Sequence, residues 1–288
     1  MESPEILIIG PGGSRGFLYI GAIMCCEHAG LLNKVKTVIG VSIGSIIGLL
    51  WLAGYNCFQI ASECLNFSLL TSETSLFDFN TLIELSKITE RWGAFSTAKI
   101  EQRLELLVKD KFGLVPTLSQ FYMLTGKRFV CVTCNYSKQS AEYLDMESKP
   151  DLSVVKAALM SSSIPTILER MVYNNQIYID GALRDPYPID HVNDGMTIIW
   201  GFYIGTKINA DNNLSTKTGL IGMLEFTLKA YSSTMEELYV RSVKNSSKNC
   251  RHILLTTATI DTTGITVSKA NRISMLATGY STVLKLIQ

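Results

Sequence analysis

The sequence predicts an α/β fold in which a mainly parallel central sheet carries helices on its faces. Residues 5–9 are typical of a fully buried strand, because 6–9 form a continuous apolar run, and a glycine-rich loop and an apolar helix at 17–29 follow it. A second, β-branched strand at 35–39, a second glycine turn and a second helix at 45–53 repeat this order. Two successive strand–turn–helix units are the signature of parallel strands joined by helices.

The composition predicts a large buried core. The chain has 288 residues, of which 47% are hydrophobic and 18% are charged, and its formal net charge is +1. These values exclude a disordered acidic or basic chain, and they exclude a nucleic-acid binder that relies on clustered Lys and Arg. The seven cysteines have irregular spacing, which indicates reduced intracellular thiols and not a disulfide framework.

The rest of the chain continues the alternation of strands and helices. We expect buried strands at 128–133, 176–179, 197–203 and 251–257, a helical cap or outer layer at 67–121, and amphipathic helices at 220–238 and 273–287. The sequence contains no repeat, low-complexity tract or obvious linker, so we predict a single domain over residues 1–288, in which 214–288 supplies helices and one strand.

Two stretches bear on membranes and export. Residues 1–5 are acidic and lack the basic region of a secretory signal, which predicts an intracellular, cytoplasmic protein. Residues 37–62 carry no charge and space Gly40, Gly44 and Gly48 four residues apart, as packed transmembrane helices also do. Because this stretch divides into a strand, a glycine turn and a helix, we favour a buried strand next to a buried helix over a membrane span.

The second glycine turn has the pattern of a nucleophile elbow. Gly40, Ser42 and Gly44 fit G-x-S-x-G between a predicted strand and a predicted helix. A serine at the tip of such a sharp turn exposes its hydroxyl above the sheet, and the flanking glycines let the backbone fold that tightly. The following helix points its amino terminus at the site, which favours the negative charge that develops there.

The first glycine loop, residues 10–16, reads Gly-Pro-Gly-Gly-Ser-Arg-Gly. A dinucleotide loop fails because Arg15 replaces the third glycine, and a phosphate loop fails because no Gly-Lys-Ser/Thr follows. The alternative use of such a loop is an oxyanion hole, in which backbone amides point at a carbonyl oxygen that becomes negative. Pro11 has no N–H, so the donors must come from Gly12, Gly13 or the residues just after them.

Together these motifs resemble the patatin-like phospholipase family. Its three sequence blocks correspond here to the loop at 10–16, the elbow at 40–44 and Asp180-Gly181-Ala182. The alanine- and serine-rich stretch at 157–165, which ends in a proline, is also similar. The resemblance covers about residues 6–188, over half of the chain.

The resemblance implies a three-layer α/β/α fold and a lipid acyl hydrolase that cleaves carboxylic esters of phospholipids or related acyl lipids through an acyl-enzyme intermediate. Ser42 would be the nucleophile, Asp180 the general base and acid, and the amides of Gly12, Gly13 and Ser14 the oxyanion hole. The remaining motif residues would support this site: Gly10, Arg15, Gly16, Gly40, Gly44 and Gly181. The resemblance implies no metal, no cofactor and no nucleic acid; the partners would be an acyl-lipid substrate and, transiently, a membrane surface. The oligomeric state stays open.

Alternatives remain at this point. Ser42, Asp180 and His252 have the chain order of a Ser–Asp–His triad, which would make the protein an esterase for small soluble esters. Pro11 stands where the family usually has glycine, which leaves room for a lipid-binding protein with little turnover. Asp185, where the family often has Asn, and Asp190 compete with Asp180 as the acid, but only Asp180 ends a predicted strand and precedes a glycine.

A lone C-x-x-C motif also invites a functional interpretation. Cys131 and Cys134 lie in a predicted buried strand, and no further ligands are spaced to complete a zinc site. We therefore expect both cysteines to be core residues.

Overall fold

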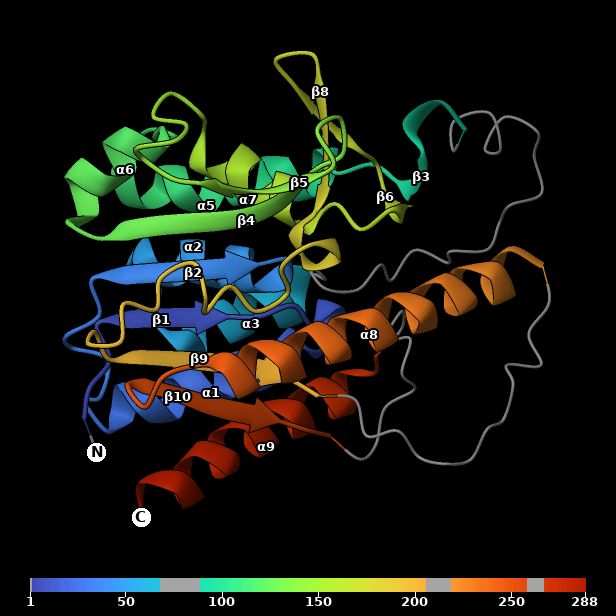
Figure 1. Cartoon of the computed structure of the whole chain (residues 1–288). Helices are drawn as coiled ribbons and strands as arrows, with labels where there is room; N and C mark the ends of the chain where they lie inside the picture. Colours follow the sequence, from blue (N-terminus) through green and yellow to red (C-terminus); the bar gives the residue numbers. More distant parts are fainter. Residues whose placement is uncertain (1, 68–88, 206–218, 258–266) are drawn as a thin grey trace.

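The computed structural model describes residues 2–67, 89–205, 219–257 and 267–288. Its centre is one mixed sheet in which strands follow the order β10-β9-β1-β2-β4-β8-β7, and β5 also pairs with β4 (Figure 1). The first five strands in that order are mutually parallel, whereas β8, β7 and β5 are antiparallel to their neighbours. This is the mainly parallel sheet that the sequence predicts.

The strands are β1 (Ile6–Ile9), β2 (Thr37–Val41), β3 (Gly93–Phe95), β4 (Arg128–Asn135), β5 (Ser140–Leu144), β6 (Thr166–Leu168), β7 (Met171–Tyr173), β8 (Gln176–Asp180), β9 (Ile199–Ile204) and β10 (Cys250–Leu255). The α-helices are α1 (Phe17–His28), α2 (Ile43–Leu52), α3 (Cys57–Phe67), α5 (Ala98–Phe112), α6 (Leu118–Thr125), α7 (Val154–Ser162), α8 (Gly219–Asn245) and α9 (Lys269–Ile287). There are also two short 3-10 turns: η1 (Gly13–Gly16) forms the second half of the glycine loop, and η2 (Gly181–Leu183) directly follows β8.

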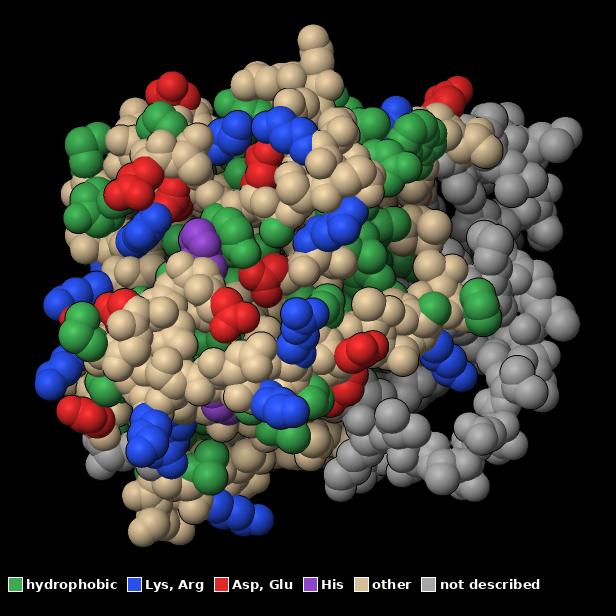
Figure 2. Space-filling model, viewed as in Figure 1, with side chains coloured by type: hydrophobic (Ala, Val, Ile, Leu, Met, Phe, Trp, Pro, Cys, Tyr) green, Lys and Arg blue, Asp and Glu red, His purple; other side chains and the backbone are tan. Residues whose placement is uncertain are grey.

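Helices cover both faces of the sheet, which gives three layers. Successive side chains of a strand point to opposite faces, so Leu7 and Ile9 join a large hydrophobic cluster with α1, α2, α3, α5, α6, α7 and α9, and Ile8 joins a second cluster on the other face. On that second face the cover comes from α8, the long orange helix of Figure 1, and from the chain that follows η2. Acidic and basic side chains are interspersed over the face that α8 crosses (Figure 2).

One edge of β4 is shared by two strands that meet end to end. Parallel β2 pairs with the first part of β4 and stops where Val41 faces Val132. Antiparallel β8 pairs with the last part, and Asp180 faces Thr133. Because β5 already occupies the opposite edge of β4 beside these same residues, β2 and β8 must lie on one edge. The carboxyl ends of both strands therefore converge on adjacent residues of β4.

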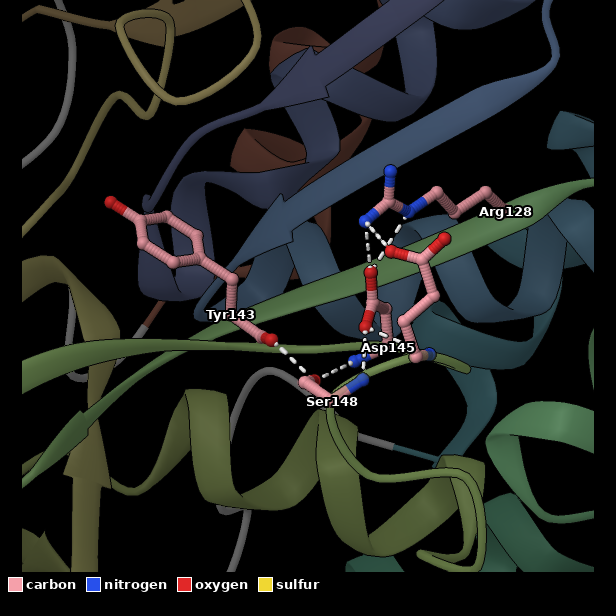
Figure 3. Close-up of polar contacts among 5 residues, drawn as sticks. Arg128, Tyr143, Asp145 and Ser148 are labelled. Atoms are coloured by element: carbon pink, nitrogen blue, oxygen red, sulfur yellow. Dashed lines mark hydrogen bonds and ion pairs between the residues drawn. The ribbon is translucent and has the colours of Figure 1, made fainter.

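A polar cluster closes the β4–β5 hairpin (Figure 3). The guanidinium of Arg128, at the start of β4, donates to Asp145, which directly follows β5. Asp145 also accepts from the backbone amide of Ser148, whose hydroxyl donates to the carbonyl of Tyr143 at 2.7 Å. Burial alone would raise the pKa of Asp145, but the hydrogen bonds from Ser148 and Arg128 outweigh it and hold the pKa below its usual value. These bonds keep β5 in register.

Most elements lie where the sequence places them, but the second strand–turn–helix unit is shifted. The strand runs over Thr37–Val41 instead of 35–39, and the helix begins at Ile43 instead of 45. The reason is that Gly40 is a strand residue paired with Ile9 and not part of the turn. The 3-10 turns η1 and η2, the helices α3 and α7 and the short strands β3, β5, β6 and β7 were not expected.

The cap predicted at 67–121 is described only in part, because residues 68–88 lie outside the described residues, as do 206–218 and 258–266 of the carboxyl-terminal region. In its described part, α5 packs Leu104, Leu107 and Val108 against the first cluster, as an outer layer would. The assignment of residues 1–288 to a single domain stays a prediction. Across the ranges that the structure describes, no helix combines the length and apolar character that crossing a membrane requires.

The approach of α9 to α1 depends on glycine. A Cβ atom at Gly279 would lie 2.0 Å from the carbonyl oxygen of Leu18, and one at Gly21 would lie 2.0 Å from that of Leu276. Two helix backbones therefore touch directly, and any side chain at these positions would push them apart.

We predict that Gly279→Ala lowers the free energy of unfolding by about 1–3 kcal/mol, because the added methyl group overpacks a rigid backbone contact. Urea unfolding measures the change. On an exposed helix the same substitution would be stabilising, so an unchanged or higher stability would contradict the contact. The exposed neighbour Ala277→Ser serves as the control and should be neutral.

Candidate active site

Ser42 stands at a strained turn between β2 and α2. Its backbone has φ 56° and ψ −128°, a region that side-chain-bearing residues rarely adopt. Tight packing around the turn requires the two flanking glycines. A Cβ atom at Gly44 would lie 2.1 Å from the carbonyl oxygen of Ile9, and one at Gly40 would lie 2.4 Å from the Cα atom of Ser45. The geometry is that of a nucleophile elbow.

Serines of α7 hold this turn from both sides. The amide of Ser42 donates to the hydroxyl oxygen of Ser161 at 3.0 Å, and Ser161 in turn donates to the carbonyl of Val132 at 2.5 Å. The hydroxyl of Ser162 lies 2.9 Å from the carbonyl oxygen of Ser42. The backbone amide and carbonyl of Ser42 are therefore both bonded to α7, and through Ser161 the turn is also connected to β4. In the sequence this role shows only as a serine run before a proline.

Asp180 ends β8 and is 1% exposed. Its Oδ1 accepts a hydrogen bond from the amide of Ala182 at 2.9 Å, and its own amide donates to the carbonyl of Ser163 at 2.9 Å. Gly181 is required next to it, because a Cβ atom there would lie 2.1 Å from the carbonyl oxygen of Val132. The carboxylate is held in one place by backbone contacts on both sides.

The pKa of Asp180 is raised to about 6, and burial is the cause. The Ser42 hydroxyl, the Ala182 amide and the Tyr231 hydroxyl lie near enough to oppose this rise by stabilising the charged form. The structure thus brings Ser42 and Asp180 together, as their positions beside Val132 and Thr133 on the shared edge of β4 require.

The glycine loop packs directly against the elbow. A Cβ atom at Gly16 would lie 2.8 Å from Cγ1 of Ile43, and one at Gly44 would lie 2.7 Å from the carbonyl oxygen of Gly10. At the turn into η1, Gly13 adopts φ +53°, which suits a residue without a side chain. The loop and the serine are therefore neighbours.

Pro11 is built into this loop as an anchor. Its carbonyl accepts a hydrogen bond from the Tyr19 hydroxyl at 2.8 Å, while the amide of Gly10 donates to Phe202 at 3.0 Å. In the described part of the chain, the amides of Gly12 and Gly13 donate to no protein acceptor. Arg15 lies near Tyr19, Tyr203 and Glu236; burial lowers the pKa of its guanidinium, and these three groups oppose the change.

The three histidines lie elsewhere. The Nδ1 atom of His252 is 2.9 Å from the Tyr187 hydroxyl and its Nε2 atom is 2.7 Å from the Ser246 hydroxyl. The sheet register runs from His252 through Gly201 and Ile8 to Ile39, three strand spacings or about 14 Å. His28 bonds to Tyr280 and His191 stacks on the ring of Tyr143. The structure does not bring an imidazole to Ser42.

Other sequence expectations resolve plainly. Cys131 and Cys134 are both buried core residues of β4, as predicted. Asp185, a competing candidate for the acid, is partly buried and accepts a 2.6 Å hydrogen bond from Tyr143. No group of three His, Cys, Asp or Glu side chains is placed to hold a metal ion within the described ranges.

Comparison with known proteins decides the family. The sequence profile of the patatin-like phospholipase family matches residues 7–192, which include the glycine loop, Ser42 and Asp180. The chain belongs to the patatin-like phospholipase family. The two helices α8 and α9 of this patatin-like protein lie beyond the matched residues.

Relatives of this patatin-like protein occur in viruses and fungi. It is 30% identical over 189 residues to "Probable lipid hydrolase 463L" of Invertebrate iridescent virus 6, an alignment that covers 65% of this chain and 62% of the viral protein. It is 26% identical to protein R571 of Acanthamoeba polyphaga mimivirus, over 83% of this chain and 78% of that protein. Lysophospholipase NTE1 of Debaryomyces hansenii is 23% identical, in an alignment that covers 64% of this chain and 10% of the yeast protein.

Solved structures support the same fold. VipD from Legionella pneumophila superimposes with a TM-score of 0.57 at 14% identity, over 99% of this chain and 67% of VipD. The type III effector ExoU gives a TM-score of 0.50 at 14% identity, over 97% of this chain and 52% of ExoU. At these identities the likeness concerns the three-layer fold alone.

We predict that Asp180→Asn stabilises this patatin-like protein at pH 7.5 by about 1–3 kcal/mol. A carboxyl whose folded-state pKa of about 6 exceeds the unfolded value of roughly 3.9 disfavours the folded state once it is charged. That cost develops as pH rises from 4 through 6, so the gain should vanish below about pH 4.

Urea unfolding of the wild type and the variant at pH 7.5 and pH 4 measures this difference. Asp151→Asn, at an exposed aspartate before α7, is the matched control and should show no such pH-dependent gain. Equal stability of wild type and Asp180→Asn at both pH values would contradict the burial argument.

Proposed function

We propose that this protein is a lipid acyl hydrolase that cleaves carboxylic ester bonds of phospholipids or related acyl lipids, with Ser42 and Asp180 as a catalytic dyad. The observation that carries the proposal is the convergence of the two side chains at the shared edge of β4, beside a glycine loop in which the amides of Gly12 and Gly13 donate to no acceptor of the described residues. The family and the names of the viral and yeast relatives support a lipid substrate.

The proposed reaction has two halves. Asp180 removes the proton of Ser42, whose oxygen attacks the ester carbonyl, and the amides of Gly12, Gly13 and Ser14 hold the resulting oxyanion. Asp180 then protonates the leaving alcohol, and the acyl group stays on Ser42. In the second half Asp180 removes a proton from water, whose oxygen attacks the acyl carbonyl. The bond between the acyl group and Ser42 then breaks, Asp180 returns the proton to the Ser42 oxygen, and the fatty acid leaves.

Burial suits Asp180 to act as this base. An aspartate with an ordinary pKa near 3.9 is a weak base for a serine hydroxyl. A pKa of about 6 brings it closer to the working pH, while most molecules remain charged at pH 7 and above. The same burial excludes water and so strengthens the interaction of the loop amides with the oxyanion. The acid limb of the activity profile should accordingly lie near pH 6.

The proposal includes an intracellular protein that meets its substrate at a membrane surface without spanning it. The absence of an imidazole at Ser42 argues against the triad esterase. The anchoring of Pro11 by Tyr19 supports a formed oxyanion loop over a lipid-binding protein without turnover.

We predict that Ser42→Ala and Asp180→Asn each lower kcat/KM at least about 1,000-fold, since each removes a reacting group. Fatty acid release from phosphatidylcholine and lysophosphatidylcholine vesicles measures the loss. Asp185→Asn, in the same segment but bonded to Tyr143, is the matched control and should keep activity within about fivefold. Wild-type turnover in either dyad variant would overturn the assignment.

Covalent labelling provides a second readout. A fluorophosphonate probe should label the wild type at Ser42 and should not label Ser42→Ala. A folded wild type that binds vesicles but neither reacts with the probe nor hydrolyses them would identify a lipid-binding protein instead.

His252→Gln separates the dyad from the triad. Because both ring nitrogens of His252 bond to Tyr187 and Ser246, we predict that this variant keeps kcat/KM within about threefold and loses only stability. Hydrolysis of p-nitrophenyl butyrate together with a thermal melt tests this. A loss comparable to that of Ser42→Ala in a folded protein would restore the triad.

A further inference from the structure

Two buried oxygens at the proposed site have no hydrogen-bond partner among the described residues. One is Oδ2 of Asp180 and the other is the hydroxyl oxygen of Tyr231. Buried polar atoms are nearly always hydrogen-bonded, so an unpaired donor and an unpaired acceptor in one place call for an explanation. The other carboxylate oxygen of Asp180 is already engaged by the amide of Ala182 at 2.9 Å.

Tyr231 reaches this place from outside the matched family region. It lies on α8, which crosses the second face of the sheet and packs on η2, the turn that directly follows Asp180 (Figure 1). Its ring packs against the cluster that contains Ala182, and its hydroxyl lies near the amide of Leu183 and the carboxyl of Asp180. The hydroxyl and the carboxylate thus lie close together but short of hydrogen-bond geometry.

Among the residues that the structure describes, three titratable or reacting groups face Asp180, and each comes from a different element. Ser42 follows β2, Cys134 belongs to β4 and Tyr231 belongs to α8. Burial raises the pKa of the Cys134 thiol, which therefore stays neutral in the pH range where Asp180 titrates. Arg184 lies near this thiol and partly opposes the rise of its pKa. Of the three, Tyr231 is the permanent O–H donor that is not itself a reactant, because burial and then the charge of Asp180 raise its pKa well above 10.

We propose that Tyr231 is a positioning residue of the dyad, which donates a hydrogen bond from its phenol to the free carboxylate oxygen of Asp180 and so holds that carboxylate toward Ser42. The inference rests on the proposed function for its catalytic meaning. No proton leaves Tyr231 in the reaction: the transferred proton moves between Ser42 and Asp180, and the phenol keeps its own. Hydrogen bonds that are long in a free enzyme shorten when substrate is bound.

The direction of the effect follows from the donor. A hydrogen bond to the charged carboxylate stabilises it and lowers the pKa of Asp180, so removing the phenol should raise this pKa further. The variant Tyr231→Phe keeps the ring and its packing and removes only the oxygen. We expect the acid limb of kcat/KM to move upward by about 0.5–1 pH unit, which lowers kcat/KM at pH 6 about two- to fivefold.

The experiment compares Tyr231→Phe with Tyr239→Phe, from the same helix. The ring of Tyr239 stacks on Tyr203 with centroids 3.8 Å apart and meets Tyr187 edge-on, so it lies in the same hydrophobic cluster. It is not among the groups that act on the pKa of Asp180. Hydrolysis of p-nitrophenyl butyrate between pH 4.5 and 9 gives kcat and KM for both variants, and thermal melts confirm their folding. The limb should move in Tyr231→Phe with KM unchanged, and it should stay in place in Tyr239→Phe.

Direct titration of the Asp180 carboxyl by 13C NMR, in the Ser42→Ala background, gives a readout independent of turnover. Addition of Tyr231→Phe should raise the measured pKa. An unmoved pKa and an unmoved limb would overturn the role of Tyr231 while leaving the dyad intact. Full activity of Ser42→Ala would instead overturn the proposed function, and the titration would still report on the hydrogen bond.

Discussion

The edge of β4 organises the whole site, because it pairs with a parallel strand at one end and an antiparallel strand at the other. The last residue of β2 pairs with Val132, and the last residue of β8 pairs with Thr133. Ser42, which follows β2, and Asp180, which ends β8, therefore lie beside adjacent residues of β4. A strand has two edges, and the hairpin partner β5 occupies the second. The contacts of Asp145 with Arg128 and Ser148 keep β5 in place and so leave the first edge to β2 and β8.

Hydrogen bonds from α7 hold the strained elbow in place. The positive φ of Ser42 is unfavourable for a residue with a side chain. The hydroxyls of Ser161 and Ser162 bond to its amide and carbonyl, and two glycines allow α2 to lie against β1 and β2. Neither serine is a candidate reactant, yet both define where the hydroxyl of Ser42 points.

Burial of Asp180 gives the site its chemical character and also its cost. This carboxylate is 1% exposed, and one of its oxygens has no hydrogen-bond partner in the described ranges, so it opposes folding when it is charged. The same desolvation raises its pKa toward the working range of a general base. The long helix α8 packs on the second face of the sheet and on η2, where it contributes Met235 and Tyr239 to the hydrophobic cluster and brings Tyr231 beside the carboxylate.

The sequence by itself determined the parallel α/β architecture and the two glycine motifs, because these depend on short-range patterns: apolar runs and glycines at fixed spacing. It also proposed Ser42 and Asp180 as the reacting pair, through an elbow motif, a carboxylate that ends a strand and the family resemblance, and that choice stays a prediction. Only the tertiary structure decided that β2 includes Gly40, that β8 shares an edge with β2, and that His252 bonds to Tyr187. It also brought Ser161 and Tyr231 to the site from more than a hundred residues away along the chain from Ser42. Strand register and long-range side-chain contacts leave no local pattern, so no window of the sequence contains them.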